Sequence, residues 1–288
     1  MLWLIKIIQF KFWLIFFLPG KLPLYIMGLS ARLIAFIVKR TSIARMVQKN
    51  MALILPPEKA TQQNANQLIT NTAYALFEII CLPYFRAEHF SAVNEIIGAE
   101  NLAKARAAGK GALLLTMHAG NYEITPSVIS RLGYPINSIL KANEPIFDPL
   151  NRARVVGGGK LINVLEKDMF TESLKVMKKN EFAGILIDTG ALESRYEKRQ
   201  FLGKEVPMAS GWLTLAQRAG CAIVPVTSRK KNGKNLITFH DLLFISPTNR
   251  DETVKKVIGI YESFILNNPD QWAIFFNSYE TKRMVEGG

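Results

Sequence analysis

The order of apolar and polar positions predicts two kinds of element that alternate along the chain. Short unbroken apolar runs, typical of strands buried on both faces, occur at residues 112–117, 183–187, 222–226 and 236–239. Helical stretches lie among them at residues 122–132, 148–156, 171–179 and 211–219. Residues 239–241 and 270–277 are further candidates for edge strands. Strands that alternate with helices predict an α/β fold with a mainly parallel central sheet covered by helices.

Three more helices are predicted before the first of these strands. Residues 22–55 have an amphipathic pattern that ends at Pro56-Pro57, and residues 61–82 have an apolar stripe that ends before Pro83. Residues 99–108 are closed by Gly109, a residue that helix ends prefer. The only plausible boundary lies near Pro56-Pro57. We therefore expect an N-terminal membrane-anchoring segment, residues 1–55, and an α/β domain, residues 56–288.

The distribution of charge is the reason for expecting a membrane anchor. The first 57 residues contain eight basic side chains, no acidic one and many large apolar ones. This mixture is typical of segments in a bilayer interface, and basic flanks favour the cytoplasmic side. A monotopic anchor is favoured, and a tilted single span stays open because spanning needs about 20 apolar residues in a row.

The whole chain is also basic, with a net charge of +13, which indicates an anionic partner. An anionic membrane surface is favoured over nucleic acid, because the N-terminal basic residues are interleaved with Trp and Phe. A second basic stretch, residues 229–234, is predicted to be a solvated loop able to touch lipid headgroups or an acidic carrier protein. The two cysteines, Cys81 and Cys221, have no metal-ligand spacing and are predicted to be buried free thiols.

The most informative residue is His118, which directly follows the first apolar run. Sites in open α/β sheets lie at the carboxyl ends of strands, and Asp188 follows the second run in the same way. Glu123 lies five residues after His118, which in a continuous helix would place the two about 140° apart. The pair therefore needs a turn at residues 119–121.

In this turn, Gly120 supplies a permissive backbone and Asn121 caps a helix that begins at Tyr122. We expect His118 to act as a general base and Glu123 to fold back and orient it. The alternative is a structural histidine, but His89 and His240, the other two in the chain, have no comparable setting.

The motif His118-Ala-Gly-Asn-Tyr-Glu123 resembles the His-x4-Glu signature of the bacterial lipid A late acyltransferases of the lauroyl/myristoyl type. These belong to the lysophospholipid acyltransferase superfamily. Similarity to the same family extends over nearly the whole chain, at residues 17–26, 50–56, 100–111, 187–203, 211–225 and 269–272. The order and spacing of these blocks are more specific than any one of them.

The resemblance implies acyl transfer from a thioester donor, acyl-ACP or acyl-CoA, to a hydroxyl of a lipid A-type glycolipid. It places the enzyme at the cytoplasmic face of the bacterial inner membrane, with an acyl carrier protein as an expected partner. His118 would deprotonate the hydroxyl, Glu123 would orient His118, and Asp188 would lie near the histidine. No metal or redox cofactor is implied. The expected substrate-binding residues are Asn121, Lys141, Arg154 and Gly203, with Lys141 and Arg154 on phosphates.

Two departures from the family pattern leave the acceptor open. Lys141 stands where the family usually has Arg, which loses bidentate phosphate geometry, and Phe276 stands where a His is typical. The alternatives are an acyltransferase for another lysolipid or glycolipid, a thioesterase that uses water, and a non-catalytic membrane scaffold with this fold.

Overall fold

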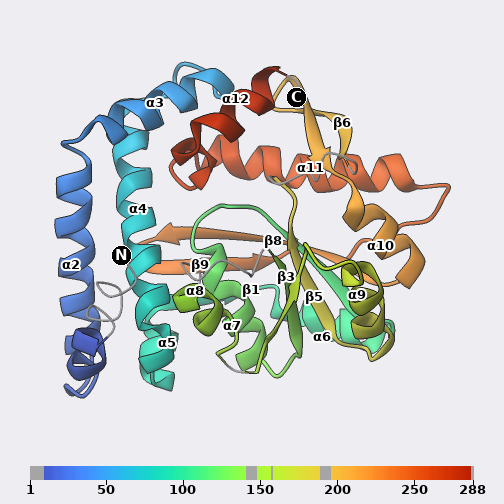
Figure 1. Cartoon of the computed structure of the whole chain (residues 1–288), viewed down its shortest axis with the longest axis horizontal. Coiled ribbons are helices and arrows are strands. Elements are labelled where there is room, and N and C mark those ends of the chain that lie inside the picture. Colours follow the sequence, from blue (N-terminus) through green and yellow to red (C-terminus); the bar gives the residue numbers. More distant parts are fainter. Residues whose placement is uncertain (1–9, 141–147, 157, 189–195, 287–288) are drawn as a thin grey trace.

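The computed structural model describes residues 10–140, 148–156, 158–188 and 196–286 of the chain (Figure 1). Within them lies a seven-stranded sheet of order β1-β9-β8-β2-β5-β3-β4. The strands are β1 (Asn94–Ile97), β2 (Ala112–Thr116), β3 (Ile136–Leu140), β4 (Lys160–Asn163), β5 (Phe182–Leu186), β8 (Ala222–Lys231) and β9 (Lys234–Phe239). Neighbouring strands are parallel except for the antiparallel pair of β8 and β9. The predicted α/β fold with a mainly parallel sheet is confirmed.

Helices cover both faces of this sheet, as the apolar runs predicted. Along β2, Leu113 and Leu115 belong to one buried cluster, and Ala112 and Leu114 belong to the other. The first cluster is closed by α9 (Met169–Lys178), α10 (Gly211–Ala219), α11 (Arg250–Asn267) and the C-terminal α12 (Ser278–Glu286). The second is closed by α4 (Gln62–Cys81), α5 (Ala87–Val93), α6 (Ala99–Ala107), α7 (Thr125–Arg131) and α8 (Asp148–Arg154).

The predicted single helix over residues 22–55 is wrong, because the structure has two helices there. These are α2 (Leu22–Val38) and α3 (Ser42–Ile54), bent by 80° relative to each other. The break occurs at Thr41, whose hydroxyl accepts a hydrogen bond from the Ile43 amide (3.2 Å) and so begins a new helix. Among the described residues, no single helix is long and apolar enough to span a membrane. Helices α2 and α3 have sufficient length and hydropathy only when they are taken together as a bent pair.

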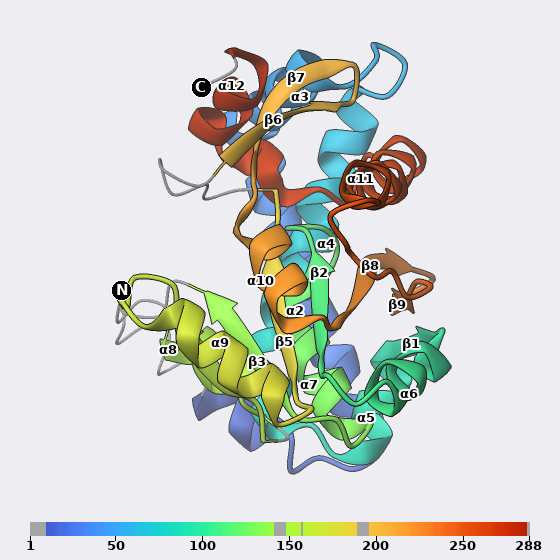
Figure 2. The same ribbon diagram turned by 90° about the vertical axis from the view of Figure 1, so that its right-hand side faces the viewer.

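Helix α3 belongs to the same core as the sheet. Val47 and Met51 are fully buried in the first cluster, and the Asn50 amide donates to the Phe275 carbonyl (2.8 Å). Helices α3 and α12 pack together at the top of both views (Figures 1 and 2). The turn at Pro56-Pro57 therefore separates two helices of one packed body. The division into an anchor and an acyltransferase domain stays a prediction.

Helix α2 packs against α4 along one stripe and presents the rest of its surface to the outside (Figure 1). Ala31 and Ala35 are buried at the contact, and Arg32 Nε donates to the Tyr74 hydroxyl (2.8 Å). The large apolar side chains point outward instead: Leu22, Tyr25, Leu29, Leu33, Ile34, Phe36 and Ile37 are exposed. An apolar face this large, left uncovered, is typical of a surface that contacts lipid or another protein.

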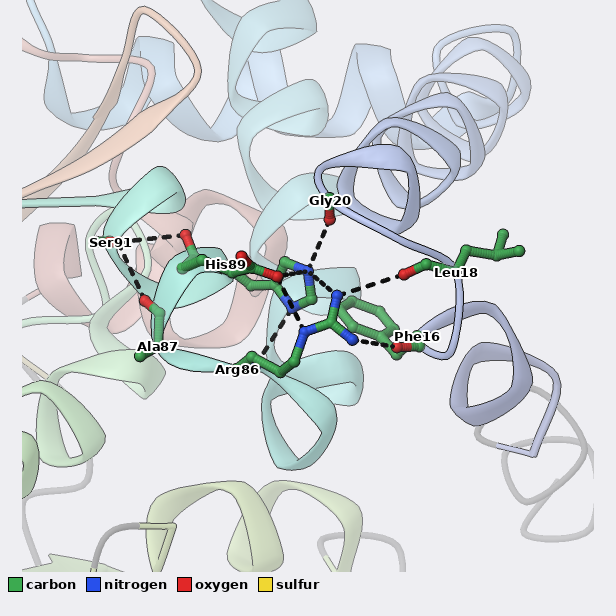
Figure 3. Close-up of polar contacts among 8 residues, drawn as sticks. Phe16, Leu18, Gly20, Arg86, Ala87, His89 and Ser91 are labelled. Carbon is green, nitrogen blue, oxygen red and sulfur yellow. Dashed lines mark hydrogen bonds and ion pairs between the residues drawn. The ribbon is translucent and has the colours of Figure 1, made fainter.

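The segment before α2 is held to the body by Arg86 and His89 (Figure 3). The Arg86 guanidinium donates to the carbonyls of Phe16 (3.1 Å) and Leu18 (3.3 Å), and His89 Nε2 contacts the Gly20 carbonyl at 3.0 Å. His89 Nδ1 lies 3.2 Å from the Arg86 amide, so the ring bridges both partners. His89 is fully buried and has this structural role.

Two predictions near the C-terminal half need correction. Residues 270–277 contain the 3₁₀ helix η4 (Ala273–Phe276) and one isolated bridge rather than an edge strand, and of residues 239–241 only Phe239 belongs to a strand. Residues 229–234 are not a loop: β8 runs to Lys231 and β9 begins at Lys234. The Lys230 side chain is 9% exposed because it pairs with a buried carboxylate.

Candidate active site

His118 and Asp188 meet at the carboxyl ends of two neighbouring parallel strands, β2 and β5. His118 Nδ1 lies 2.8 Å from Asp188 Oδ1, and the His118 amide donates to Asp188 Oδ2 at 2.9 Å. The Asp188 side chain is completely buried, whereas 28% of the His118 side chain is exposed. The carboxylate therefore holds the imidazole from inside the protein while the ring reaches the surface.

Trp272 supplies a further hydrogen bond to the same carboxylate. Its indole Nε1 donates to Asp188 Oδ2 at 2.8 Å, and the whole residue is buried. The backbone of this segment is joined to the histidine loop, because the Ala273 amide donates to the His118 carbonyl at 2.7 Å. Asp188 thus accepts from both sides and is fixed in place.

The electrostatics of the pair favour the ion pair of imidazolium and carboxylate. Burial lowers the pKa of His118, but the charge and hydrogen bond of Asp188 outweigh burial and raise the pKa above its ordinary value. Burial raises the pKa of Asp188, but His118 and the Trp272 indole outweigh it and hold that pKa below its ordinary value. Because an ionised carboxylate only accepts hydrogen bonds, Nδ1 is the nitrogen that donates, and Nε2 is the basic nitrogen of the neutral ring.

The turn after His118 is built on Gly120, as predicted. Its φ is +59°, and a Cβ there would lie 2.1 Å from the Ser228 carbonyl oxygen, so a larger residue does not fit. The predicted cap at Asn121 is wrong. Residues Tyr122–Ile124 form a 3₁₀ turn before α7, and the Asn121 side chain does not cap it. The Asn121 amide donates to Glu78 Oε2 at 2.8 Å instead, and the residue is only 2% exposed.

Glu123 contacts a different partner from the one expected. Its two carboxylate oxygens accept from Arg154 Nε and Nη2, each at 2.6 Å, in a bidentate pair. Both side chains are largely buried, and Arg154 Nη1 also donates to Asn151 at 2.8 Å. The hydrogen bond that orients the imidazole comes from Asp188, although the Glu123 charge also helps to raise the pKa of His118. The 3₁₀ turn directs Glu123 towards α8, which is the reason that the expected contact is not formed.

Tyr122 packs against the imidazole between these two acids. The two rings meet edge to face, with centroids 5.0 Å apart. Burial and the neighbouring Glu123 charge raise the pKa of the phenol, so it stays protonated. Tyr122 therefore restricts the rotation of His118 without adding a charge.

An apolar pocket begins beside the same loop. The empty space in it is about 510 Å³, a figure that includes space open to solvent. Strands β2, β3 and β5 and helix α7 supply apolar lining residues that include Leu114, Ile129 and Ile139. Tyr122, Glu123 and Arg154 also line it, so the pocket adjoins the bidentate pair.

The remaining two predicted substrate-binding residues are Lys141 and Gly203. Lys141 lies outside the described residues. Gly203, with φ of +75°, forms with Leu202 the two-residue turn of the hairpin of β6 (Tyr196–Phe201) and β7 (Lys204–Ala209). This hairpin supports the site from a distance, because Phe201 packs edge to face on Trp272 with centroids 5.9 Å apart.

Trp272 is a site residue for which no role was predicted. It lies 84 residues from Asp188, and no local pattern connects the two. The only available signal was the similarity of residues 269–272 to a block of a known family. That similarity identifies the segment but does not predict which group the Trp272 indole contacts.

Comparison with known proteins agrees with the geometry. The sequence model of the bacterial lipid A biosynthesis acyltransferase family matches residues 1–281. The chain is also similar to a lipid A biosynthesis acyltransferase of Haemophilus influenzae, with 22% identity over 246 residues that cover 82% of this chain and 75% of that protein. The match over nearly the whole length shows that this chain belongs to the bacterial lipid A biosynthesis acyltransferase family.

Proposed function

We propose that this protein transfers a fatty acyl chain from a thioester donor to a hydroxyl of a lipid A-type glycolipid, with His118 as the general base. The observation that carries the proposal is the hydrogen bond between His118 Nδ1 and the buried Asp188 carboxylate. It fixes the tautomer whose Nε2 accepts a proton, and a raised pKa makes that nitrogen a stronger base.

The reaction then follows from the chemistry of the pair. Nε2 of His118 takes the proton of the acceptor hydroxyl as its oxygen attacks the thioester carbonyl. The imidazolium that forms is stabilised by Asp188, which stays ionised. Collapse of the tetrahedral intermediate breaks the carbon–sulfur bond, and His118 returns the proton to the leaving thiolate. The products are the acyl ester and the free thiol, and no metal or redox cofactor takes part.

The pocket and the bidentate pair give the substrate two places to bind. In the proposed complex the acyl chain enters the apolar pocket that begins beside Tyr122 and is lined by residues of β2, β3 and β5. Arg154 lies beside it, held by Glu123 in a fixed orientation. In the proposed complex this cation contacts an anionic group of a substrate, and Lys141 adds a second positive charge.

Helix α2 is proposed to lie in the membrane interface. Its exposed apolar side chains form a continuous face, and Lys21, Lys39 and Arg40 flank it at its two ends. Apolar and basic side chains together bind the surface of an anionic bilayer. We therefore propose that the protein works at the cytoplasmic face of the bacterial inner membrane. The net charge of +13 also suits an acidic acyl carrier protein as donor partner.

The proposal is tested by lipid mass spectrometry on the full chain in detergent. Wild type and His118→Ala would each receive acyl carrier protein and CoA donors in separate reactions, with underacylated lipid A as acceptor. We expect the glycolipid to gain one acyl mass with wild type and none with His118→Ala.

Parallel reactions distinguish the rival activities. A lysophospholipid acceptor that gains acyl mass while lipid A gains none would move the function to another lysolipid. Donor consumed without any acylated lipid, at the same rate with and without acceptor, would indicate a thioesterase. Equal activity of wild type and His118→Ala would remove His118 from the mechanism.

A further inference from the structure

A buried ion pair lies behind the loop that carries His118. Glu78, on α4, is 1% exposed, and Lys230, near the end of β8, donates to its Oε1 atom. The Lys230 side chain is itself 9% exposed, and its ammonium lies over the Tyr74 ring, 5.3 Å from the ring centroid. Neither residue belongs to the motifs that point to catalysis.

The second oxygen of Glu78 accepts from two buried amides. Asn121, three residues after His118, donates to Oε2 at 2.8 Å, and Asn235 of β9 donates to the same oxygen at 2.8 Å. Asn235 also donates to Asn94 of β1 at 3.2 Å. Glu78 thereby connects the histidine loop to a helix and to the sheet.

The contacts close into a ring. The Lys230 amide donates to the side-chain oxygen of Gln271 (2.8 Å), and the Gly120 amide donates to the Gln271 carbonyl (2.8 Å). Because Gly120 is joined covalently to Asn121, the ring runs through Glu78, Asn121, Gly120, Gln271 and Lys230. The next residue after Gln271 is Trp272, whose indole holds Asp188.

The ring therefore contacts both halves of the acid–base pair. On one side it fixes the loop after His118, and on the other it fixes the segment that orients Asp188. A buried ion pair adds little net stability, because desolvation of the two charges offsets their attraction. The location of this pair is explained better by a role in positioning the active-site segments than by a role in stability.

We propose that Glu78 and Lys230 are positioning residues that hold the Asn121 loop and the Gln271-Trp272 segment in register for His118 and Asp188. The inference rests on the proposed function of that pair. The contact that transmits the effect is the hydrogen bond from Asn121 to residue 78, and Lys230 offsets the negative charge of that buried acceptor.

Two double variants test this directly, because both remove the ion pair and only one of them keeps at residue 78 an acceptor for the Asn121 and Asn235 amides. Glu78→Gln/Lys230→Met removes both charges and keeps an acceptor for Asn121. Glu78→Leu/Lys230→Met removes both charges and the acceptor. We expect the Gln variant to keep kcat within about threefold of wild type, and the Leu variant to lose about 10- to 100-fold in kcat with nearly unchanged donor KM.

Asn121→Ala provides a second test if the Leu variant does not fold. It cuts the ring at the loop and leaves Glu78 bonded to Lys230 and Asn235, and we expect the same selective loss of kcat. Asn101→Ala is the matched control, since it removes a buried bond to the Phe239 carbonyl (3.1 Å), which lies at the opposite end of β9 from Asn235. It is expected to lower Tm to a similar extent and to leave kcat unchanged.

His118→Ala, assayed beside these variants, distinguishes a failure of the proposed function from a failure of the positioning role. Activity of His118→Ala equal to wild type would overturn the proposed function, and the positioning role with it. An inactive His118→Ala combined with equal kcat for the two double variants would overturn the positioning role alone. An equal kcat loss in Asn101→Ala would assign the effect to general destabilisation and would also overturn it.

Discussion

Glu123 and Asp188 were both predicted to support His118, and the two carboxylates differ in their partners. Glu123 is five residues away in the chain and binds Arg154 with both oxygens. Asp188 is 70 residues away and binds the imidazole with one oxygen and the His118 amide with the other. Parallel neighbouring strands bring Asp188 close, whereas the turn after His118 directs Glu123 away. Proximity in the chain is therefore a poor guide to which acid supports a base.

The two carboxylates also face partners of different kinds. Arg154 is always charged, so its pair with Glu123 is a permanent element of the pocket wall. His118 titrates, so its pair with Asp188 changes during the proposed reaction. The variants below are chosen to separate these roles.

The largest effect is expected for Asp188→Asn. The amide keeps the shape of the carboxylate but loses its charge and favours the wrong tautomer of His118. The same change in serine proteases lowers kcat by about 10⁴, and we expect a loss of similar order here. Steady-state kinetics with saturating donor measure it. A loss of less than about tenfold would show that Asp188 is not the group that supports the base.

A smaller effect is expected for Glu123→Gln. The variant leaves the His118–Asp188 bond intact and weakens the hold on Arg154, so the change should appear chiefly in KM, by about tenfold. A double-mutant cycle with Arg154→Gln measures whether the two act as one unit, in which case the double variant is no worse than the worse single one. A kcat loss as large as that of Asp188→Asn would contradict the assignment.

The smallest effect is expected for Trp272→Phe, which removes one hydrogen bond to Asp188 and keeps a ring in the core. A lost bond to a charged group costs about 1.5–3 kcal/mol. Part of this should appear in catalysis, as a kcat loss of about threefold, and the rest as a lower Tm. Calorimetry and kinetics on one preparation measure both. An unchanged kcat would show that the indole only fills space.

Much of the fold was predictable because its central strands are unbroken apolar runs. β2 and β5 were predicted to within one residue at each end, and β8 was predicted at its apolar half. β3 was missed because Asn137 and Ser138 interrupt its apolar pattern, although both are buried. The hairpin of β6 and β7 was missed because its first strand is mostly charged or polar. The break at Thr41 was missed because a single capping residue is a weaker sequence signal than the apolar periodicity of the segments on either side of it.

The site was predictable in position and less so in its contacts. His118 and Asp188 each follow a predicted strand. Because sites in open α/β sheets lie at the carboxyl ends of strands, both residues could be predicted as site residues. The predicted partners of Glu123 and Asn121 were wrong. Glu123 pairs with Arg154 of α8 and Asn121 with Glu78 of α4, and only the tertiary structure brings these helices to the site. Trp272 could not be assigned for the same reason.

The central claim is that Asp188, rather than Glu123, sets the state of His118, and direct titration of that imidazole tests it. The chain has only three histidines, so His118 can be assigned by NMR from its loss in His118→Ala. In wild type its pKa should lie above the ordinary value. In Asp188→Asn it should fall markedly, because Asp188 is the largest influence that opposes burial, and in Glu123→Gln it should fall only slightly. A larger drop in Glu123→Gln than in Asp188→Asn would contradict the account.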